Sequence, residues 1–275
     1  MPFFLFADAI LIGGIILWWL HGSGFAADPL NEAMLLALFG AHGMLVLSAL
    51  YKRNRIGISW FGVRQFAQSA GLTLVACFLA LAPEATGALL VGDVPSRPTL
   101  EWFRSQLPLM ACFALAGIGS AAMCFALLCL ELERSGARQM AVYLGASGYA
   151  LLFSGYVGSL PCVADGGLAG GGGVALAAMS ERWMMAYAAG YLFIATRHLM
   201  APGLLLGLWE WSTRSVLSHP GAMIGQEPLW NTGALPLEAF WGLRLVGAGL
   251  ALGWCMWMYG RCQPPDDPRT RRHLR

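Results

Sequence analysis

The residues of this chain with the clearest capacity for chemistry are charged side chains that interrupt apolar sequence. Glu210 and Arg214 are four residues apart, so on a helix they share a face and can neutralise each other. Glu181 and Arg182 are adjacent and point in different directions, so each needs a partner on another helix, with Arg214 or Glu210 the natural choice. Arg244 either joins this group or extends its side chain to the membrane surface. These five residues predict a polar path or binding pocket between two helices, or a structural charge cluster that holds the helices together.

Three histidines are candidate ligands. His42 lies near the middle of an apolar segment, where a histidine can ligate haem or relay protons. Ligation of haem by two histidines requires a second histidine at the same depth, and the sequence offers none. His21 and His219 fall near the outer face of the expected topology and could form a metal or haem site there. We therefore predict no cofactor and no metal, with haem left open at His42 and a metal left open at His21 and His219.

The segment Gly145-Ala146-Ser147-Gly148 resembles the Gly-x-Ser-Gly motif of rhomboid intramembrane proteases. The resemblance covers only these residues and His198, and it implies Ser147 as the nucleophile and His198 as its base. Rhomboid proteases begin a helix at this serine and face it outward, whereas Ser147 is expected about two turns inside the cytoplasmic end of the span 140–159. The histidine and asparagine on the second helix of that family have no counterpart. Short strings of small residues also occur wherever helices pack closely.

Membrane-spanning helices are the elements that must position these side chains. Apolar residues make up 57% of the chain and charged residues 12%, against about 25% charged in an ordinary soluble domain. Several apolar runs reach the roughly 20 residues that are needed to cross a bilayer, and lipid offers no partners to an unpaired backbone. The alternating pattern of a membrane β-barrel does not occur. The predicted fold class is all-α, a polytopic helical membrane protein.

The number of spans follows from the cationic loops. Lys and Arg are concentrated in the loop 52–64, the turn 134–138 and the tail 261–275, which the positive-inside rule places in the cytoplasm. An even number of crossings must then separate the turn from the tail, so the long apolar stretch 172–217 should cross twice, turning near Arg197. We predict eight spans, or seven if 172–217 does not cross twice. Their approximate bounds are 3–20, 31–51, 65–82, 107–130, 140–159, 172–193, 199–217 and 237–260.

Glycines and prolines predict how the spans pack and where they end. Gly203-x-x-x-Gly207 and Gly249-x-x-x-Gly253 should let the last spans approach their neighbours closely. Proline predicts helix ends before Pro83 and Pro161 and helix starts near Pro108 and Pro236. An end at Pro83 leaves Glu84 in an outer loop.

The whole chain is predicted to form one transmembrane domain, residues 1–262, followed by a short cytoplasmic tail, 263–275, that is expected to be disordered. Both termini should lie in the cytoplasm, and the short arginine-rich loops indicate a bacterial inner membrane. The basic residues are flanked by spans, which argues against nucleic-acid binding. The expected partners are the lipid bilayer and other membrane proteins.

No motif of high specificity accompanies these candidates, which favours a protein that is not an enzyme. The leading hypothesis is a non-catalytic integral subunit or accessory protein of a larger inner-membrane complex, of secretion, transfer or respiratory type. One alternative is a small-solute transporter or channel that uses the polar cluster between the sixth and seventh spans. A further alternative is a rhomboid-like intramembrane serine protease.

Overall fold

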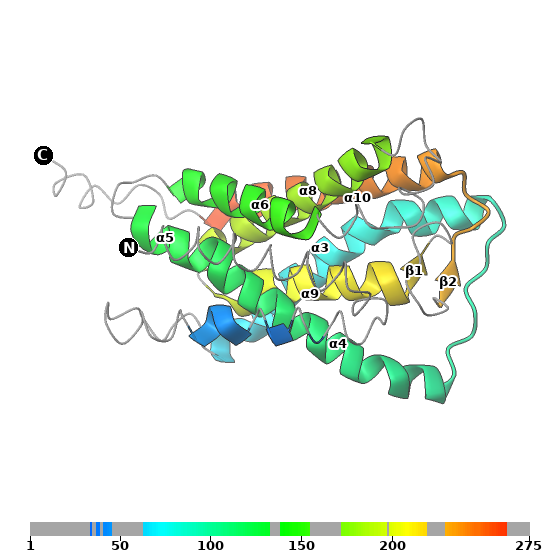
Figure 1. Cartoon of the computed structure of the whole chain (residues 1–275), viewed down its shortest axis with the longest axis horizontal. Helices are drawn as coiled ribbons and strands as arrows, with labels where there is room; N and C mark the ends of the chain where they lie inside the picture. The colour runs from blue at the N-terminus through cyan, green and yellow to red at the C-terminus, as the bar shows by residue number, and fades with distance from the viewer. Residues whose placement is uncertain are drawn as a thin grey trace, which may run out of the picture.

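Long helices that pack side by side make up almost all of the described protein in the computed structural model (Figure 1). The structure describes residues 34, 37–38, 41–45, 63–132, 138–154, 172–196, 198–218 and 229–262. The elements within the longer ranges are α3 (Val63–Leu90), α4 (Leu100–Ala121), the π-helical turn η3 (Ala122–Ala126), α5 (Leu127–Leu132), α6 (Arg138–Ser154), α8 (Gly172–Thr196), α9 (Met200–Ser215), β1 (Leu217–Ser218), β2 (Trp230–Asn231) and α10 (Leu237–Cys262).

The helices form a layered bundle. α9 packs against α3, α4 and α8, while α8 also packs against α6 and α10, and α10 against α3. β1 and β2 pair in parallel at one end of the bundle, and α5 lies at the other end (Figure 1). The predicted all-α class is therefore confirmed, apart from the two short strands β1 and β2.

Three of the described helical segments are long and apolar enough to cross a membrane: Ala70–Leu90, Leu100–Ala126 and Leu237–Arg261. These segments indicate a membrane protein. The helix α9 has 16 residues, which is short of the roughly 20 residues that a full crossing takes. The helix α6 is described over 17 residues, up to Ser154. α8 has 25 residues and carries the adjacent Glu181 and Arg182 in its first half.

The long apolar stretch 172–217 folds as two helices, as the sequence predicts. α8 ends at Thr196 and α9 begins at Met200. The Thr196 hydroxyl donates a hydrogen bond to the carbonyl of Leu192 at 2.7 Å and accepts one from the backbone N–H of His198 at 3.3 Å. The first bond lies within the last turn of α8 and the second reaches the backbone just beyond it, so the Thr196 side chain links the end of α8 to the turn.

The predicted helix end at Pro83 is wrong. α3 continues through Pro83 to Leu90. A proline within a helix removes one backbone hydrogen bond and costs about 3 kcal/mol, so contacts beyond it must offset that cost. Residues after Pro83 are buried against α10, including Glu84 at 1% exposure. Glu84 therefore belongs to the helical core and not to an outer loop.

The predicted helix start near Pro108 is also wrong, because α4 begins eight residues earlier, at Leu100. The side chain of Thr99 caps the helix by accepting a hydrogen bond from the backbone N–H of Trp102 at 3.1 Å. An N-cap of this kind contributes about 1 kcal/mol and sets the start of a helix. The predicted start near Pro236 is confirmed, since α10 begins at Leu237.

One of the two predicted glycine motifs makes a close crossing, between α4 and α9. A Cβ atom added to Gly203 would lie 2.8 Å from the backbone nitrogen of Ile118, and one added to Gly207 would lie 2.8 Å from the Cα atom of Ala114. The other motif makes no such crossing within the described residues, where a Cβ atom added to Gly249 or Gly253 meets nothing within 4 Å.

Several predicted features lie outside the described residues. They are the span 3–20, all but a few residues of 31–51, the end of 140–159, the proline at 161 and the tail 263–275.

Candidate functional site

Six charged side chains from four helices meet inside the bundle. Three are carboxylates and three are guanidinium groups, so the cluster has no formal net charge. Five of them are the charged residues that the sequence singles out, and the sixth is Glu84. We call this set the charge network: Glu84 on α3, Glu181 and Arg182 on α8, Glu210 and Arg214 on α9, and Arg244 on α10.

Arg244 organises one half of the network. Its Nε atom donates to Oε2 of Glu84 at 3.1 Å, and its Nη1 atom lies 3.6 Å from Oε2 of Glu181. Its Nη2 atom donates to the backbone carbonyl of Thr213 at 3.2 Å, which reaches α9. The guanidinium carbon also lies 4.8 Å from the ring centroid of Phe240, within the range of a cation–π contact. One arginine therefore joins α3, α8, α9 and α10.

Glu210 organises the other half. Its Oε1 atom accepts a hydrogen bond from Nε of Arg182 at 3.4 Å. Its Oε2 atom accepts from Nε and Nη2 of Arg214 at 3.3 and 3.2 Å. Arg214 also lies over the ring of Phe113 on α4, with 5.3 Å between the guanidinium carbon and the ring centroid. The structure thus forms both the contact within α9 and the contact between helices that the sequence suggests.

The two halves are connected through α8. Glu181 and Arg182 are neighbours in sequence and point in different directions, one toward Arg244 and the other toward Glu210. Burial of an isolated charge is costly, and opposite charges in contact offset much of that cost. The exposed fractions of Glu84, Glu181 and Glu210 are 1%, 4% and 5%, so these carboxylates depend on the arginines around them.

Glu84 is the member that sequence reasoning misses. A signal for it exists in the spacing of the buried residues Ala76, Ala80 and Ala88, which are separated by multiples of four. Glu84 occupies the missing position in that series. Residues four apart lie on one helix face, so the series predicts an inward Glu84 if the helix is allowed to continue past Pro83.

Two polar atoms of the network have no hydrogen-bond partner within the described part of the chain. They are Oε1 of Glu84 and Nη1 of Arg182, and both are buried. An unpaired buried polar atom costs about 1–3 kcal/mol. The network is therefore balanced in charge but incompletely hydrogen-bonded at these two positions.

The structure does not bring Ser147 and His198 together. The Ser147 hydroxyl accepts a hydrogen bond from Nε1 of Trp183 at 3.3 Å, which fixes its level along α8. His198 lies beyond the end of α8 at Thr196. The helix from 183 to 196 advances about 20 Å at 1.5 Å per residue. Ser147 and His198 therefore lie at different heights along α8, one beside Trp183 and the other beyond Thr196, and they do not form a dyad.

The remaining histidines form no site in the described structure. His42 belongs to a helical turn, residues 41–45, and its side chain is exposed, while the adjacent Gly43 packs against Met123. His21 and His219 lie outside the described residues. Within the described ranges, no group of three or more His, Cys, Asp or Glu side chains is arranged to hold a metal ion.

The charge network is therefore the candidate site. Comparison of the chain with protein-family models, with curated proteins and with solved structures gave no match in any of the three.

Proposed function

We propose that this chain is a non-catalytic integral membrane subunit or accessory protein of a larger complex, and that the charge network locks its helices into one arrangement. The observation that carries the proposal is the mutual pairing of the charges. Each of the three carboxylates contacts at least one arginine, and Arg244 and Glu210 contact two opposite charges each. A catalytic or transport site needs groups that are available to a substrate, whereas these groups are engaged with one another.

The exterior of the bundle supports a place in the membrane. Large apolar side chains are exposed on the described helices. They include Leu74 and Phe78 on α3 and Phe103, Leu107 and Leu115 on α4, whose exposed fractions are 51–70%. Exposing such surface to water is unfavourable, at about 25 cal/mol per Å². Lipid or the apolar surface of another membrane protein would remove that cost.

We further propose that the chain crosses a bacterial inner membrane eight times, with both termini in the cytoplasm. The separation of α8 from α9 supports this count, because it supplies the two helices that the even parity of the cationic loops requires. The shortness of α9 is compatible with a crossing only if the bilayer is locally thinner or the loop residues complete the span.

A reporter experiment tests this topology. An enzyme active only in the cytoplasm, fused after Arg275, should be active, and a reporter active only outside should be silent. Fusion of the same reporters within the turn 91–99, between α3 and α4, should give the opposite result. A cytoplasmic signal from both positions would contradict the eight-span topology.

Extraction in mild detergent tests the subunit hypothesis. The tagged protein should co-purify with specific membrane proteins in a fixed ratio, measured by quantitative mass spectrometry. The control is a tagged protein of similar hydropathy from the same membrane, which should not bring down the same companions. A single monodisperse species that carries no companion would count against an accessory subunit.

A small-solute transporter or channel is the second candidate, and one observation favours it. The network retains an unpaired acceptor, Oε1 of Glu84, and an unpaired donor, Nη1 of Arg182, among the described residues. A polar solute or an ion could use these atoms if the helices separated. Replacement of the charged side chains by neutral ones distinguishes the two hypotheses. A purely structural network should tolerate the replacement, whereas a transport site should lose its activity.

A further inference from the structure

The charge network divides into two halves that carry opposite formal charges. Arg244 faces two carboxylates, those of Glu84 and Glu181, so this half is negative by one charge. Glu210 faces two guanidinium groups, those of Arg182 and Arg214, so the other half is positive by one charge. The neutrality of the whole network therefore does not extend to each group of contacts within it.

The two carboxylates of the negative half share one guanidinium group. Oε2 of Glu84 accepts a hydrogen bond from Nε of Arg244 at 3.1 Å, whereas Oε2 of Glu181 lies 3.6 Å from Nη1. Both carboxylates are buried, and within the described part of the chain no other arginine or lysine forms an ion pair with either of them. Two carboxylates in one site favour the form in which one proton is bound, because two negative charges close together are costly.

The unpaired oxygen of Glu84 fits the same form. Oε1 of Glu84 is buried and accepts no hydrogen bond from any described residue. An ionised carboxylate can only accept hydrogen bonds, whereas a protonated one also donates. A proton bound by either carboxylate therefore supplies a donor to this half and removes its excess negative charge.

The other charged and titratable groups nearby are directed to the positive half. Arg182, which follows Glu181 in the sequence, donates from Nε to Glu210, and Arg214 pairs with the same carboxylate. Tyr149 on α6 interacts electrostatically with Glu210 and Arg182. These groups leave the negative half without a second positive charge in contact with it.

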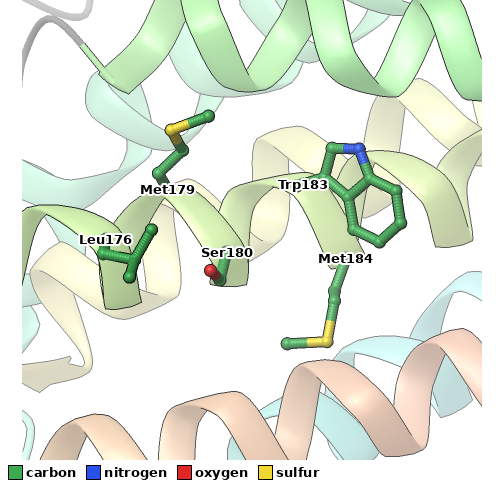
Figure 2. A pocket seen from close by; sticks show the side chains of 5 residues that line it. All are labelled: Leu176, Met179, Ser180, Trp183 and Met184. Carbon is green, nitrogen blue, oxygen red and sulfur yellow. The ribbon is translucent and has the colours of Figure 1, made fainter.

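A pocket of about 290 Å³ on the surface of α8 does not give a hydrated ion access to the negative half. No charged side chain lines this pocket, whose lining residues are Leu176, Met179, Ser180, Trp183 and Met184 (Figure 2). Glu181 follows Ser180 in the sequence, but successive residues of a helix point in different directions. A cation in this pocket would not contact the carboxylates, whereas a proton needs no cavity to bind them.

We propose that Glu84 and Glu181 hold one proton between them at neutral pH, beside Arg244, and that its release weakens the packing of α3 and α8 against α10. The inference rests on the proposed structural role of the charge network and adds the ligand that regulates it. With the proton bound, one carboxylate faces one arginine and the half is neutral. After release of the proton to solvent, two buried carboxylates repel each other across Arg244.

Infrared spectroscopy of the purified protein in lipid tests the proposal. Solvated aspartate and glutamate side chains are ionised at neutral pH, and a protonated carboxylic acid has a C=O stretching band that is separate from theirs. The band should correspond to one protonated group per chain, and it should shift in heavy water because the proton exchanges. Absence of the band from the unsubstituted protein would overturn the proposal, whatever any variant shows.

Glu84→Gln and Glu181→Gln should each remove the band. Either substitution leaves one carboxylate opposite Arg244, so no excess negative charge remains to hold a proton. Asp93→Asn is the matched control, because it neutralises a carboxylate in the turn between α3 and α4, where the side chain accepts a hydrogen bond from the backbone N–H of Ala234. That variant should keep the band. Persistence of the band in either glutamine variant would contradict a proton that depends on both carboxylates.

The pH dependence of unfolding in detergent is an independent measurement. A solvated glutamate loses its proton at about pH 4.3, so above this pH the folded protein binds one proton more than the unfolded chain. Stability should therefore be greatest on the acid side and fall as the pH rises, until the folded protein also releases its proton. The unfolding equilibrium constant should rise by up to about tenfold per pH unit relative to either glutamine variant. Parallel pH profiles of the three proteins would reject the proposal.

The outcomes separate this inference from the proposed function. If the infrared band is absent while specific companions co-purify, no proton is bound and the subunit hypothesis stands. If the band is present and depends on both carboxylates while no companion co-purifies, the proton site stands and the subunit hypothesis fails.

Discussion

Replacement of Arg244 by methionine is expected to lower the free energy of unfolding by about 3–5 kcal/mol. Methionine has a similar length but no charge, so Glu84 and Glu181 would remain buried without their arginine. The substitution also removes the hydrogen bond to the carbonyl of Thr213. Unfolding in detergent, followed by circular dichroism against increasing sodium dodecyl sulfate, measures this loss.

A charge-free variant is the control for this prediction. In the triple variant Glu84→Gln, Glu181→Gln and Arg244→Met, both carboxylates become neutral amides together with the loss of the arginine. Buried ion pairs are often replaceable by neutral groups of similar volume at little cost, so the triple variant should recover most of the lost stability. Equal destabilisation of the single and triple variants would show that lost packing, and not uncompensated charge, is responsible.

The same triple variant distinguishes the two proposed functions. If the charge network is a structural lock, the triple variant should still co-purify with the same membrane proteins, because its stability is restored. A transporter predicts a protein that folds and reaches the membrane but has lost its activity, because the charges would be part of the solute path.

Replacement of Gly207 by alanine is expected to destabilise the protein by about 1–3 kcal/mol. The added Cβ would meet the backbone of α4 at Phe113 and Ala114, with 2.8 Å to the Ala114 Cα atom. Backbone atoms cannot move aside as a flexible side chain can, so α4 and α9 would have to separate. The midpoint of thermal unfolding in detergent should fall.

Gly249→Ala is the matched control, because it makes the same chemical change in a helix of the same protein. An added Cβ there meets no atom of the described part of the chain within 4 Å. Alanine is a better helix former than glycine by about 1 kcal/mol, so this variant should be unchanged or slightly more stable. A fall in stability as large as that of Gly207→Ala would indicate that the open face of α10 is covered by another protein or another part of the assembly.

The sequence by itself was sufficient for features that depend on composition and local spacing. The scarcity of charge and the length of the apolar runs predict a helical membrane protein. The positions of the arginines predict that 172–217 is two helices, and α8 and α9 agree with that division. The pairing of Glu210 with Arg214 follows from helical periodicity, and the pairing of Glu210 with Arg182 follows from the need of a buried charge for a partner.

The tertiary structure alone decided which helices meet and which faces they use. A proline such as Pro83 ends a helix unless later contacts offset its cost, and the contact of Glu84 with Arg244 joins residues 160 positions apart. The same applies to the two glycine motifs, which are alike in sequence. Among the described residues, Gly203 and Gly207 face a neighbouring backbone and Gly249 and Gly253 do not. Ser147 and His198 are separated for the same reason. Local spacing determines which residues share a face of a helix, but the partner of that face is chosen by the packing of the whole bundle.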